Sequence, residues 1–276
     1  MAELQGAPLG EKSAYIDQYD PNLLFQIPRK TKRDEIDVSE ILPFSGWDIW
    51  NAYEISWLDA KGKPQVAIGE FYIVASTPCI VESKSFKLYL NSYNNTKFAN
   101  WQQIEQQLKT DLEQVVQGEV RVKLCSLDAY HQQAVANFTS KCLDDLDVEC
   151  EQYQPSLDLL REDEHAENSG VVHSHLLKSN CLVTAQPDWA SIEIAYSGAR
   201  ICHASLLKYI VSFRNHNEFH EQCVERMFMD ISRRFSPEQL TIYARYTRRG
   251  GLDINPIRST EIIDNVEFLN QRQTRQ

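Results

Sequence analysis

The second half of the chain repeats a segment of the first half at a fixed offset of 120 residues. The segment YLNSYNN (89–95) aligns with YIVSFRN (209–215), so that Ser92 corresponds to Ser212. Self-similarity at a fixed spacing indicates a duplicated structural module. A chain of 276 residues is long enough for two modest domains. We therefore expect two copies of one architecture in tandem.

Patterns typical of secondary structure follow one another in the same order in both halves. The first half predicts strands over 38–58, 65–76 and 119–127 and an amphipathic helix within 91–117; the second half predicts two strands within 170–196, with a turn at 186–189, a helix over 217–235 and a strand over 239–248. This order predicts an α+β fold, with antiparallel sheets backed by helices, in two modules at 1–138 and 139–276. An acidic connecting region is expected within 139–168.

The composition limits the classes of partner and the compartment. The net charge is −11, and an acidic surface repels phosphate backbones, so we expect no direct nucleic-acid partner. No apolar run approaches the length of a membrane span, and the N-terminus lacks the pattern of a secretory signal. The seven cysteines are odd in number and form no CxxC pair, which favours reduced thiols in the cytoplasm.

The two copies have retained different polar residues. Glu82 and Lys84 of the first copy correspond to uncharged residues in the second copy, and His220 and Glu221 of the second copy likewise have uncharged counterparts in the first. Polar groups cost stability unless they are satisfied or used. The pattern suggests one composite site built from both halves. The alternative is that two diverged halves kept different solvated charges.

The stretch SNCLVTAQPDW (179–189) contains a candidate nucleophile. Cys181 ends an apolar strand, where a loop would give its thiol the partial exposure that reactivity requires. Asp188, in a turn with Pro187 and Trp189, could donate a proton if burial keeps it protonated. The alternative is a buried structural cysteine and an ordinary turn aspartate.

Two histidines of the preceding strand are candidate metal ligands. His173 and His175 are two residues apart, so both side chains point to one face of a strand, and with Cys181 they could bind zinc. We prefer a polar strand face, because no acidic or cysteine partner lies at a spacing typical of a metal site. The sequence therefore predicts no metal.

Two further motifs could hold a heterocycle and a phosphate. His220 and Glu221 open a helix, where Glu also complements the helix dipole, and a carboxylate can accept two N–H groups from a guanine-like edge. In TRRGGLD, Arg248 and Arg249 could hold phosphate, with Gly250 allowing close backbone approach. That motif also fits a solvated turn, and no GxGxxG fingerprint occurs in the chain.

Four motifs together resemble one enzyme family. They are ESKSFKLY (82–89), SNCLVTAQPDW (179–189), SFRNHNEFHE (212–221) and ARYTRRGGLDINPIRS (244–259). They occur in the order found in the long, duplicated form of the NADPH-dependent 7-cyano-7-deazaguanine reductases, the nitrile reductases of queuosine biosynthesis. The resemblance covers nearly the whole chain. It implies two tunnelling-fold (T-fold) modules per chain and pairing of chains into a homodimer.

The resemblance also implies a reaction and residue roles. A nitrile would be reduced to a primary amine with two NADPH, and no metal would be needed. Cys181 would form a covalent thioimide with the nitrile carbon, and Asp188 would donate a proton. The deazaguanine would be bound by Val81, Glu82, Ser83, His220 and Glu221, and NADPH by Ser83, Lys84, Arg249 and Gly250. Lys87 either assists or is merely solvated.

Two other functions remain open on the sequence. One is a zinc-dependent cousin of the cyclohydrolase type, acting on GTP or a pterin. The other is a non-catalytic purine-binding protein in which Cys181 is structural. The Cys181–Asp188 pair together with ESKSFKLY favours the reductase.

Overall fold

The computed structural model describes residues 15–130 and 135–276. The N-terminal segment, on which the expected absence of a secretory signal rests, lies outside the described residues. In the part of the chain that is described, no helix has the length and apolar character needed to cross a membrane. The described residues divide into two compact units: unit 1 contains 15–32, 48–130 and 248–253, and unit 2 contains 33–47, 135–247 and 254–276. The domain boundary between 138 and 139 stays a prediction.

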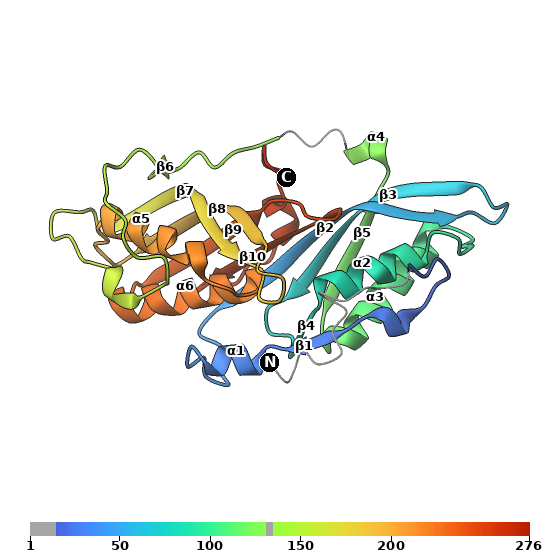
Figure 1. Cartoon of the computed structure of the whole chain (residues 1–276), viewed down its shortest axis with the longest axis horizontal. Coiled ribbons are helices and arrows are strands. Elements are labelled where there is room, and N and C mark those ends of the chain that lie inside the picture. Colours follow the sequence, from blue (N-terminus) through green and yellow to red (C-terminus); the bar gives the residue numbers. More distant parts are fainter. Residues whose placement is uncertain (1–14, 131–134) are drawn as a thin grey trace. The chain divides into compact units, whose positions relative to one another are not determined.

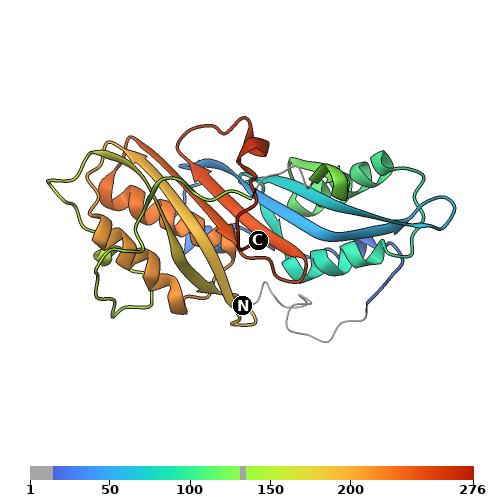
Figure 2. The same cartoon turned by 90° about the horizontal axis from the view of Figure 1, so that it is seen from above.

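The first half of the chain forms an antiparallel sheet with two long helices (Figure 1). Its elements are η2 (Pro21–Leu23), β1 (Gln26–Pro28), α1 (Lys30–Asp34), β2 (Ser45–Leu58), β3 (Pro64–Val74), β4 (Cys79–Val81), α2 (Ser83–Ser92), α3 (Trp101–Val116), β5 (Val120–Cys125) and α4 (Leu127–Tyr130). The sheet order in unit 1 is β5-β3-β2, and β1 pairs with β4 separately. Figure 2 shows β2 and β3 as a long hairpin, coloured blue to cyan. On α3, the apolar side chains of Ile104, Leu108 and Leu112 are buried in the core.

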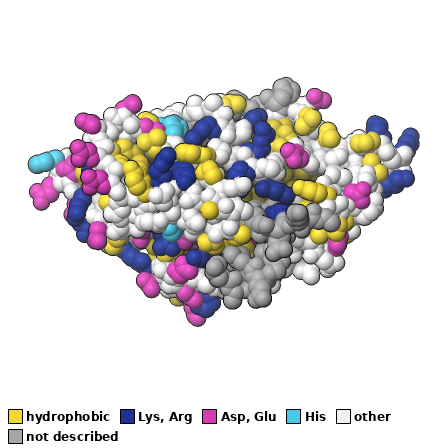
Figure 3. All heavy atoms as spheres, in the orientation of Figure 1, with side chains coloured by type: hydrophobic (Ala, Val, Ile, Leu, Met, Phe, Trp, Pro, Cys, Tyr) yellow, Lys and Arg dark blue, Asp and Glu magenta, His cyan; other side chains and the backbone are white. Residues whose placement is uncertain are grey.

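The second half repeats this arrangement. Its elements are β6 (Lys141–Cys142), η3 (Leu157–Leu159), β7 (Ser169–Asn180), β8 (Pro187–Ser197), α5 (His203–Ser212), η4 (Phe213–Asn215), α6 (His220–Phe235), β9 (Gln239–Tyr246), β10 (Leu252–Ser259) and η5 (Val266–Leu269). The order in unit 2 is β10-β9-β8-β7-β6; β7 to β10 are antiparallel and β6 joins β7 in parallel. The expected α+β class, with antiparallel sheets backed by helices, is confirmed. On the face in Figure 3, acidic side chains (magenta) gather at the end that carries the connecting segment.

Matching hydrogen bonds confirm the internal duplication. Helices α2 and α5 begin and end at residues separated by the same offset of 120. In unit 1 the hydroxyl of Tyr89 donates to the Asp111 carboxylate at 2.6 Å. In unit 2 the hydroxyl of Tyr209 donates to the Asp230 carboxylate, also at 2.6 Å. The tyrosine–aspartate link between the two helices of each copy has therefore been kept.

The sequence patterns missed several elements. The helix expected within 91–117 corresponds to α3, but α2 and α5 were not predicted, and neither was the strand β10. The turn expected at 186–189 is wrong, because β8 already begins at Pro187. Proline at the first position of a strand needs no ladder hydrogen bond from its nitrogen, so a turn-like composition is compatible with a strand start.

Candidate active site

Cys181 lies at the start of a tight loop that joins β7 to β8. Its N–H donates to the Gln186 carbonyl at 2.8 Å, and the N–H of Ala185 donates to the Cys181 carbonyl at 3.0 Å. Ala185 has a φ of 55°, in the left-handed region that non-glycine residues seldom adopt. These contacts fix the backbone on both sides of the thiol. The Cys181 side chain is only 8% exposed, so it is more enclosed than the partial exposure expected from the sequence.

Asp188 belongs to β8 and not to a turn, which corrects the expectation from the sequence. It pairs with Ser179 across the β7–β8 ladder and is buried. Cys181 follows Ser179 by two residues and lies just beyond the end of β7, next to the strand pair that carries Asp188. Diagonal neighbours on one face of an antiparallel pair have Cβ atoms roughly 7–8 Å apart. Cys181 and Asp188 therefore adjoin one another at the end of the β7–β8 pair.

The start of α6 is attached to the same loop through Asn180. The N–H of Asn180 donates to the His216 carbonyl at 2.8 Å, and its carbonyl accepts the N–H of Glu218 at 3.1 Å. This short parallel bridge brings the first turn of α6 next to the end of β7. As a result, His220 Nε2 lies 3.4 Å from the Asp188 carboxylate.

The His220 ring is held by stacking. It lies parallel to the Tyr246 ring at 3.8 Å between centroids, and Tyr246 is completely buried in β9. Burial raises the pKa of the Tyr246 hydroxyl well above its usual value, with Cys223 and Asp188 adding to the effect. The Nδ1 atom of His220 is buried and has no hydrogen-bond partner among the described residues. A buried polar atom of this kind is a candidate for contact with a ligand.

Glu218 anchors the segment that leads into α6, and the sequence patterns did not single it out. Arg226 donates two hydrogen bonds to its carboxylate, at 2.7 and 3.0 Å, and His216 Nε2 lies at 2.9 Å. Burial alone would raise the pKa of Glu218, but the hydrogen bonds with His216 and Arg226 hold it below its ordinary value. Glu218 therefore acts as a fixed anion that positions the segment before Glu221, itself buried in the first turn of α6.

In unit 1, Glu82 is the N-cap of α2. Its carboxylate accepts the N–H groups of Lys84 and Ser85 at 2.7 and 2.8 Å, and the side chain is 1% exposed. Burial raises its pKa, and the two backbone hydrogen bonds oppose that rise. Buried Val81 ends β4 just before it, and Ser83 is the first residue of α2. The side chain of Glu82 therefore has a structural role as the cap of α2, independent of any ligand.

A cavity of about 570 Å³ lies beside α2 within unit 1. Lys84, Lys87 and Gly250 are among its lining residues, and so is Glu54. Of the residues predicted to bind NADPH, Lys84 and Gly250 thus share this cavity, with Ser83 and Arg249 next to them in sequence. Two ammonium groups around one cavity suit a phosphorylated ligand. The Glu54 carboxylate adds a hydrogen-bond acceptor suited to a hydroxyl.

The two glycines of the RRGG motif form a tight hairpin turn. Gly250 and Gly251 have φ values of 57° and 76°. The N–H of Arg249 donates to the Leu252 carbonyl at 2.8 Å, and the reverse bond measures 3.2 Å. Positive φ at both central residues defines a type I′ turn, which explains the glycine pair. The predicted contact of Arg249 with phosphate stays a prediction.

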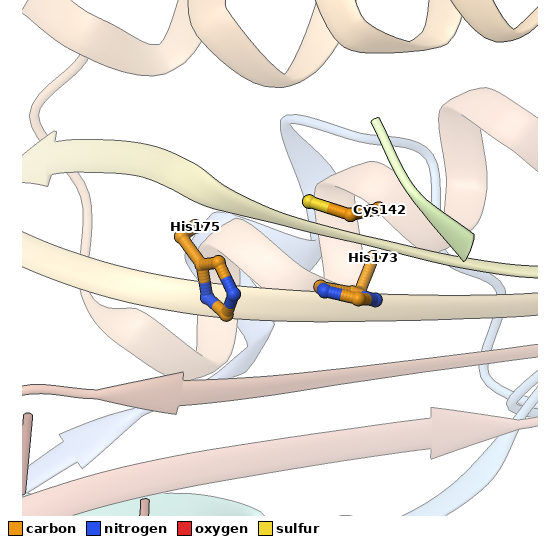
Figure 4. Close-up of side chains that lie close together, drawn as sticks. All are labelled: Cys142, His173 and His175. Carbon is orange, nitrogen blue, oxygen red and sulfur yellow. The ribbon is translucent and has the colours of Figure 1, made fainter. Parts of the chain in front are cut away.

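His173 and His175 do not group with Cys181. Together with Cys142 they place one ligand atom each within 4.8 Å of the others (Figure 4). Cys142 precedes His173 by 31 residues, and no local spacing in the sequence indicated it.

Comparisons with known proteins identify the family. A family model described as "Nitrile reductase, 7-cyano-7-deazaguanine-reductase N-term" matches residues 15–124, and one described as "QueF-like protein" matches 187–264. Proteins named NADPH-dependent 7-cyano-7-deazaguanine reductase are 55% identical in Delftia acidovorans, over 91% of this chain and 92% of that protein, and 54% identical in Ralstonia nicotianae, over 94% and 95%. The chain belongs to this reductase family.

Further relatives agree with this assignment. The reductase of Chromobacterium violaceum is 52% identical over 92% of this chain and 91% of that protein. A solved structure of the archaeosine synthase QueF-Like in the apo form covers 36% of this chain at 14% identity, with a TM-score of 0.32, and the assignment does not rest on it. Membership in the reductase family confirms the resemblance seen in the four motifs. The roles of individual residues stay predictions.

Proposed function

We propose that this protein reduces the nitrile of 7-cyano-7-deazaguanine to the primary amine of 7-aminomethyl-7-deazaguanine, and that it serves queuosine biosynthesis. As a member of the reductase family it is an NADPH-dependent oxidoreductase. The observation that carries the residue assignment is the arrangement within unit 2, where the loop of Cys181, the buried Asp188 and the stacked His220 adjoin one another.

The first step proposed is attack of the Cys181 sulfur on the nitrile carbon. A nitrile accepts hydride poorly, and covalent activation divides one difficult step into easier ones. One S–C bond forms and one C–N π bond breaks, giving a thioimide. The nitrile nitrogen takes a proton from Asp188, and the proton lost by the thiol restores Asp188.

His220 has a positioning role in this scheme. Its Nε2 atom lies within 3.4 Å of Asp188, so it can stabilise the carboxylate once the proton has been transferred. Stacking on Tyr246 prevents the ring from turning away. The Nδ1 atom, which has no hydrogen-bond partner among the described residues, could then form a hydrogen bond with the heterocycle.

Two NADPH molecules, bound one after the other, would each supply one hydride for the four-electron reduction of nitrile to amine. The residues of unit 1 that would hold it are Ser83, Lys84, Arg249 and Gly250. The cavity lined by Lys84, Lys87 and Gly250 supports this assignment through its cationic groups. Because Glu82 already accepts the N–H groups at the start of α2, phosphate recognition there would rest on lysine side chains and not on the helix N-terminus.

Recognition of the deazaguanine is assigned to two carboxylates and their neighbours. Glu221 would accept the amidine-like N–H pair of the base, with His220 beside it. Val81, Glu82 and Ser83 would contribute from unit 1. Both oxygens of Glu82 already accept one backbone N–H each, but a carboxylate oxygen can accept a second hydrogen bond, so the cap and a ligand contact are compatible.

The proposed substrate is the free base and not tRNA. A net charge of −11 opposes binding to a phosphate backbone, which supports this choice. We place the enzyme in the cytoplasm as a homodimer, in line with its reduced-thiol composition and the family resemblance.

The test is NADPH oxidation by the purified, metal-stripped chain with 7-cyano-7-deazaguanine. We expect two NADPH consumed per nitrile and a mass increase on the intact protein equal to the nitrile when NADPH is withheld. Cys181→Ala should lose both signals, whereas Cys150→Ala, the matched control, should keep them. Turnover by Cys181→Ala at a rate near that of the wild type would refute the thioimide step, and reversible binding without an adduct would favour a purine-binding protein.

A further inference from the structure

A second group of ligating side chains lies in unit 2, away from the residues assigned to catalysis. Strand β6 pairs with β7 in parallel, with Cys142 directly opposite His173, and the N–H of Leu143 donates to the His173 carbonyl at 2.9 Å. His175 follows two residues along β7, and its ring contacts that of His173 at 5.0 Å between centroids. One sulfur and two imidazole nitrogens thereby come within 4.8 Å of one another (Figure 4).

The hydrogen bonds of His173 leave one ring nitrogen suited to a metal. Ser140 Oγ lies 2.7 Å from a Glu193 carboxylate oxygen and 3.0 Å from His173 Nδ1. A hydroxyl has one proton, and the carboxylate accepts it, so Nδ1–H must donate to Ser140. The proton on Nδ1 leaves a lone pair on Nε2. A carboxylate that orients a histidine in this way is the usual outer partner of a metal-binding imidazole.

His175 and Cys142 are held by the same short segment. His175 Nδ1 lies 2.8 Å from Ser191 Oγ, which also accepts a hydrogen bond from Arg275 at 3.2 Å. The carboxylate of Asp144, two residues after Cys142, accepts hydrogen bonds from the backbone N–H of His175 at 3.0 Å and from the Ser174 hydroxyl at 2.6 Å. The backbone that carries the thiol is thus fixed to β7 immediately beside the two rings.

We propose that Cys142, His173 and His175 bind one borderline-soft divalent transition-metal ion, such as Zn²⁺, with water as a fourth ligand. Thiolate and imidazole are the ligand types that Zn²⁺ prefers in tetrahedral sites. Typical Zn–N and Zn–S bond lengths imply ligand atoms roughly 3.3–3.6 Å apart, so the side chains must close by about 1 Å. The Cys142 side chain is exposed on a two-residue edge strand, where such a shift is easily made.

The ion would act as a clamp and not as a catalyst. It would join the acidic connecting segment, of which β6 is part, to β7. His175 precedes Cys181 by six residues, roughly 20 Å along an extended strand, so the ion would not reach the proposed nucleophile. This assignment goes beyond the proposed function and is independent of it.

The test uses Co²⁺ as a spectroscopic substitute, titrated into the full-length, metal-free and reduced protein. We expect one equivalent bound per chain, a thiolate-to-cobalt charge-transfer band, the intense visible bands of a tetrahedral ion, and displacement of Co²⁺ by Zn²⁺. Cys142→Ser should abolish the charge-transfer band, and His175→Ala should weaken binding by at least about 100-fold. Cys150→Ser, a cysteine of the same connecting segment, should leave the titration unchanged.

Three results would overturn the proposal: binding that does not saturate near one equivalent, a charge-transfer band that survives in Cys142→Ser, or a band lost instead in Cys181→Ala. Circular dichroism of the metal-free variants confirms that each is folded. NADPH oxidation by Cys142→Ser should match the wild type. Failure of nitrile reduction with intact cobalt binding would therefore refute only the proposed function.

Discussion

Replacing Glu82 by alanine should reveal how much its side chain stabilises the fold as a helix cap. Its carboxylate accepts the N–H groups of Lys84 and Ser85, the second of which is fully buried. The duplicated copy supplies a natural comparison, because Cys202 occupies the same N-cap position of α5 without a side-chain cap. The cost of removing the Glu82 cap can thus be compared with a matched change where no cap exists.

The magnitude follows from those two bonds. Loss of an N-cap side chain costs about 1 kcal/mol, and up to about 2 kcal/mol in well-packed sites. An unsatisfied buried N–H, here that of Ser85, belongs at the upper end of this range. We therefore expect Glu82→Ala to lose about 2 kcal/mol of unfolding free energy. For a chain of this size that corresponds to a fall in Tm of about 4–8 °C.

The assay is thermal unfolding followed by circular dichroism, with KM for the nitrile measured in parallel. Glu82→Gln keeps an oxygen that can cap the helix, so it should retain most of the stability. Cys202→Ala should shift Tm by no more than about 2 °C. If Glu82 also binds the base, both Glu82 variants should raise KM. A wild-type Tm for Glu82→Ala would refute the capping argument.

The same side chain predicts a dependence on pH. Burial raises the pKa of Glu82 above its ordinary value of 4.5. Folding then favours the neutral form, so this contribution to stability is present below pH 4.5 and is lost as the pH rises through the folded-state pKa. Glu82→Gln is neutral throughout. Its Tm relative to wild type should therefore increase between about pH 4 and about pH 8; a constant difference would contradict the raised pKa.

Three further changes test other parts of the molecule. Asp188→Asn should lower kcat by about 10²–10⁴-fold, the usual contribution of a general acid, with a smaller effect on nitrile binding; an unchanged kcat would exclude its role as proton donor. Glu225→Ala should cost about 3–5 kcal/mol in urea unfolding, because Arg33 and Arg258 would lose the buried carboxylate to which both donate. Gly251→Ala should cost about 1–2 kcal/mol by the same measurement, because φ at this position is 76°.

The sequence predicted α3 and the long hairpins but not α2 and α5, and the reason lies in particular serines. Ser85 and Ser92 are buried in α2, where each hydroxyl donates to a carbonyl of the preceding turn. Ser205 and Ser212 do the same in α5. Buried polar positions hide the apolar periodicity from which a helix is recognised. Only the tertiary structure shows that these faces are internal.

The candidate site was predictable only where a short motif contains the residue. Cys181 and His220 fall within such motifs, and the structure places their segments side by side through Asn180. Glu218 and Tyr246 also lie within quoted motifs, 212–221 and 244–259, but the motifs alone did not indicate a role for either residue. A tyrosine in a strand has no special pattern, and its role as a stacking surface for His220 depends on the pairing of β9 with β8.

The two copies differ most where their helices begin. In unit 1, the Asn100 side chain caps α3 by accepting the Gln103 N–H at 2.9 Å, and Glu82 caps α2. In unit 2, neither Cys202 nor Phe219 supplies a side-chain cap to its helix. Both copies nevertheless keep the tyrosine–aspartate hydrogen bond between their two helices, Tyr89–Asp111 in unit 1 and Tyr209–Asp230 in unit 2. At α6 the Gln222 side chain accepts the Phe219 N–H at 3.4 Å, whereas α5 lacks a side-chain cap, which contributes about 1 kcal/mol where one is present.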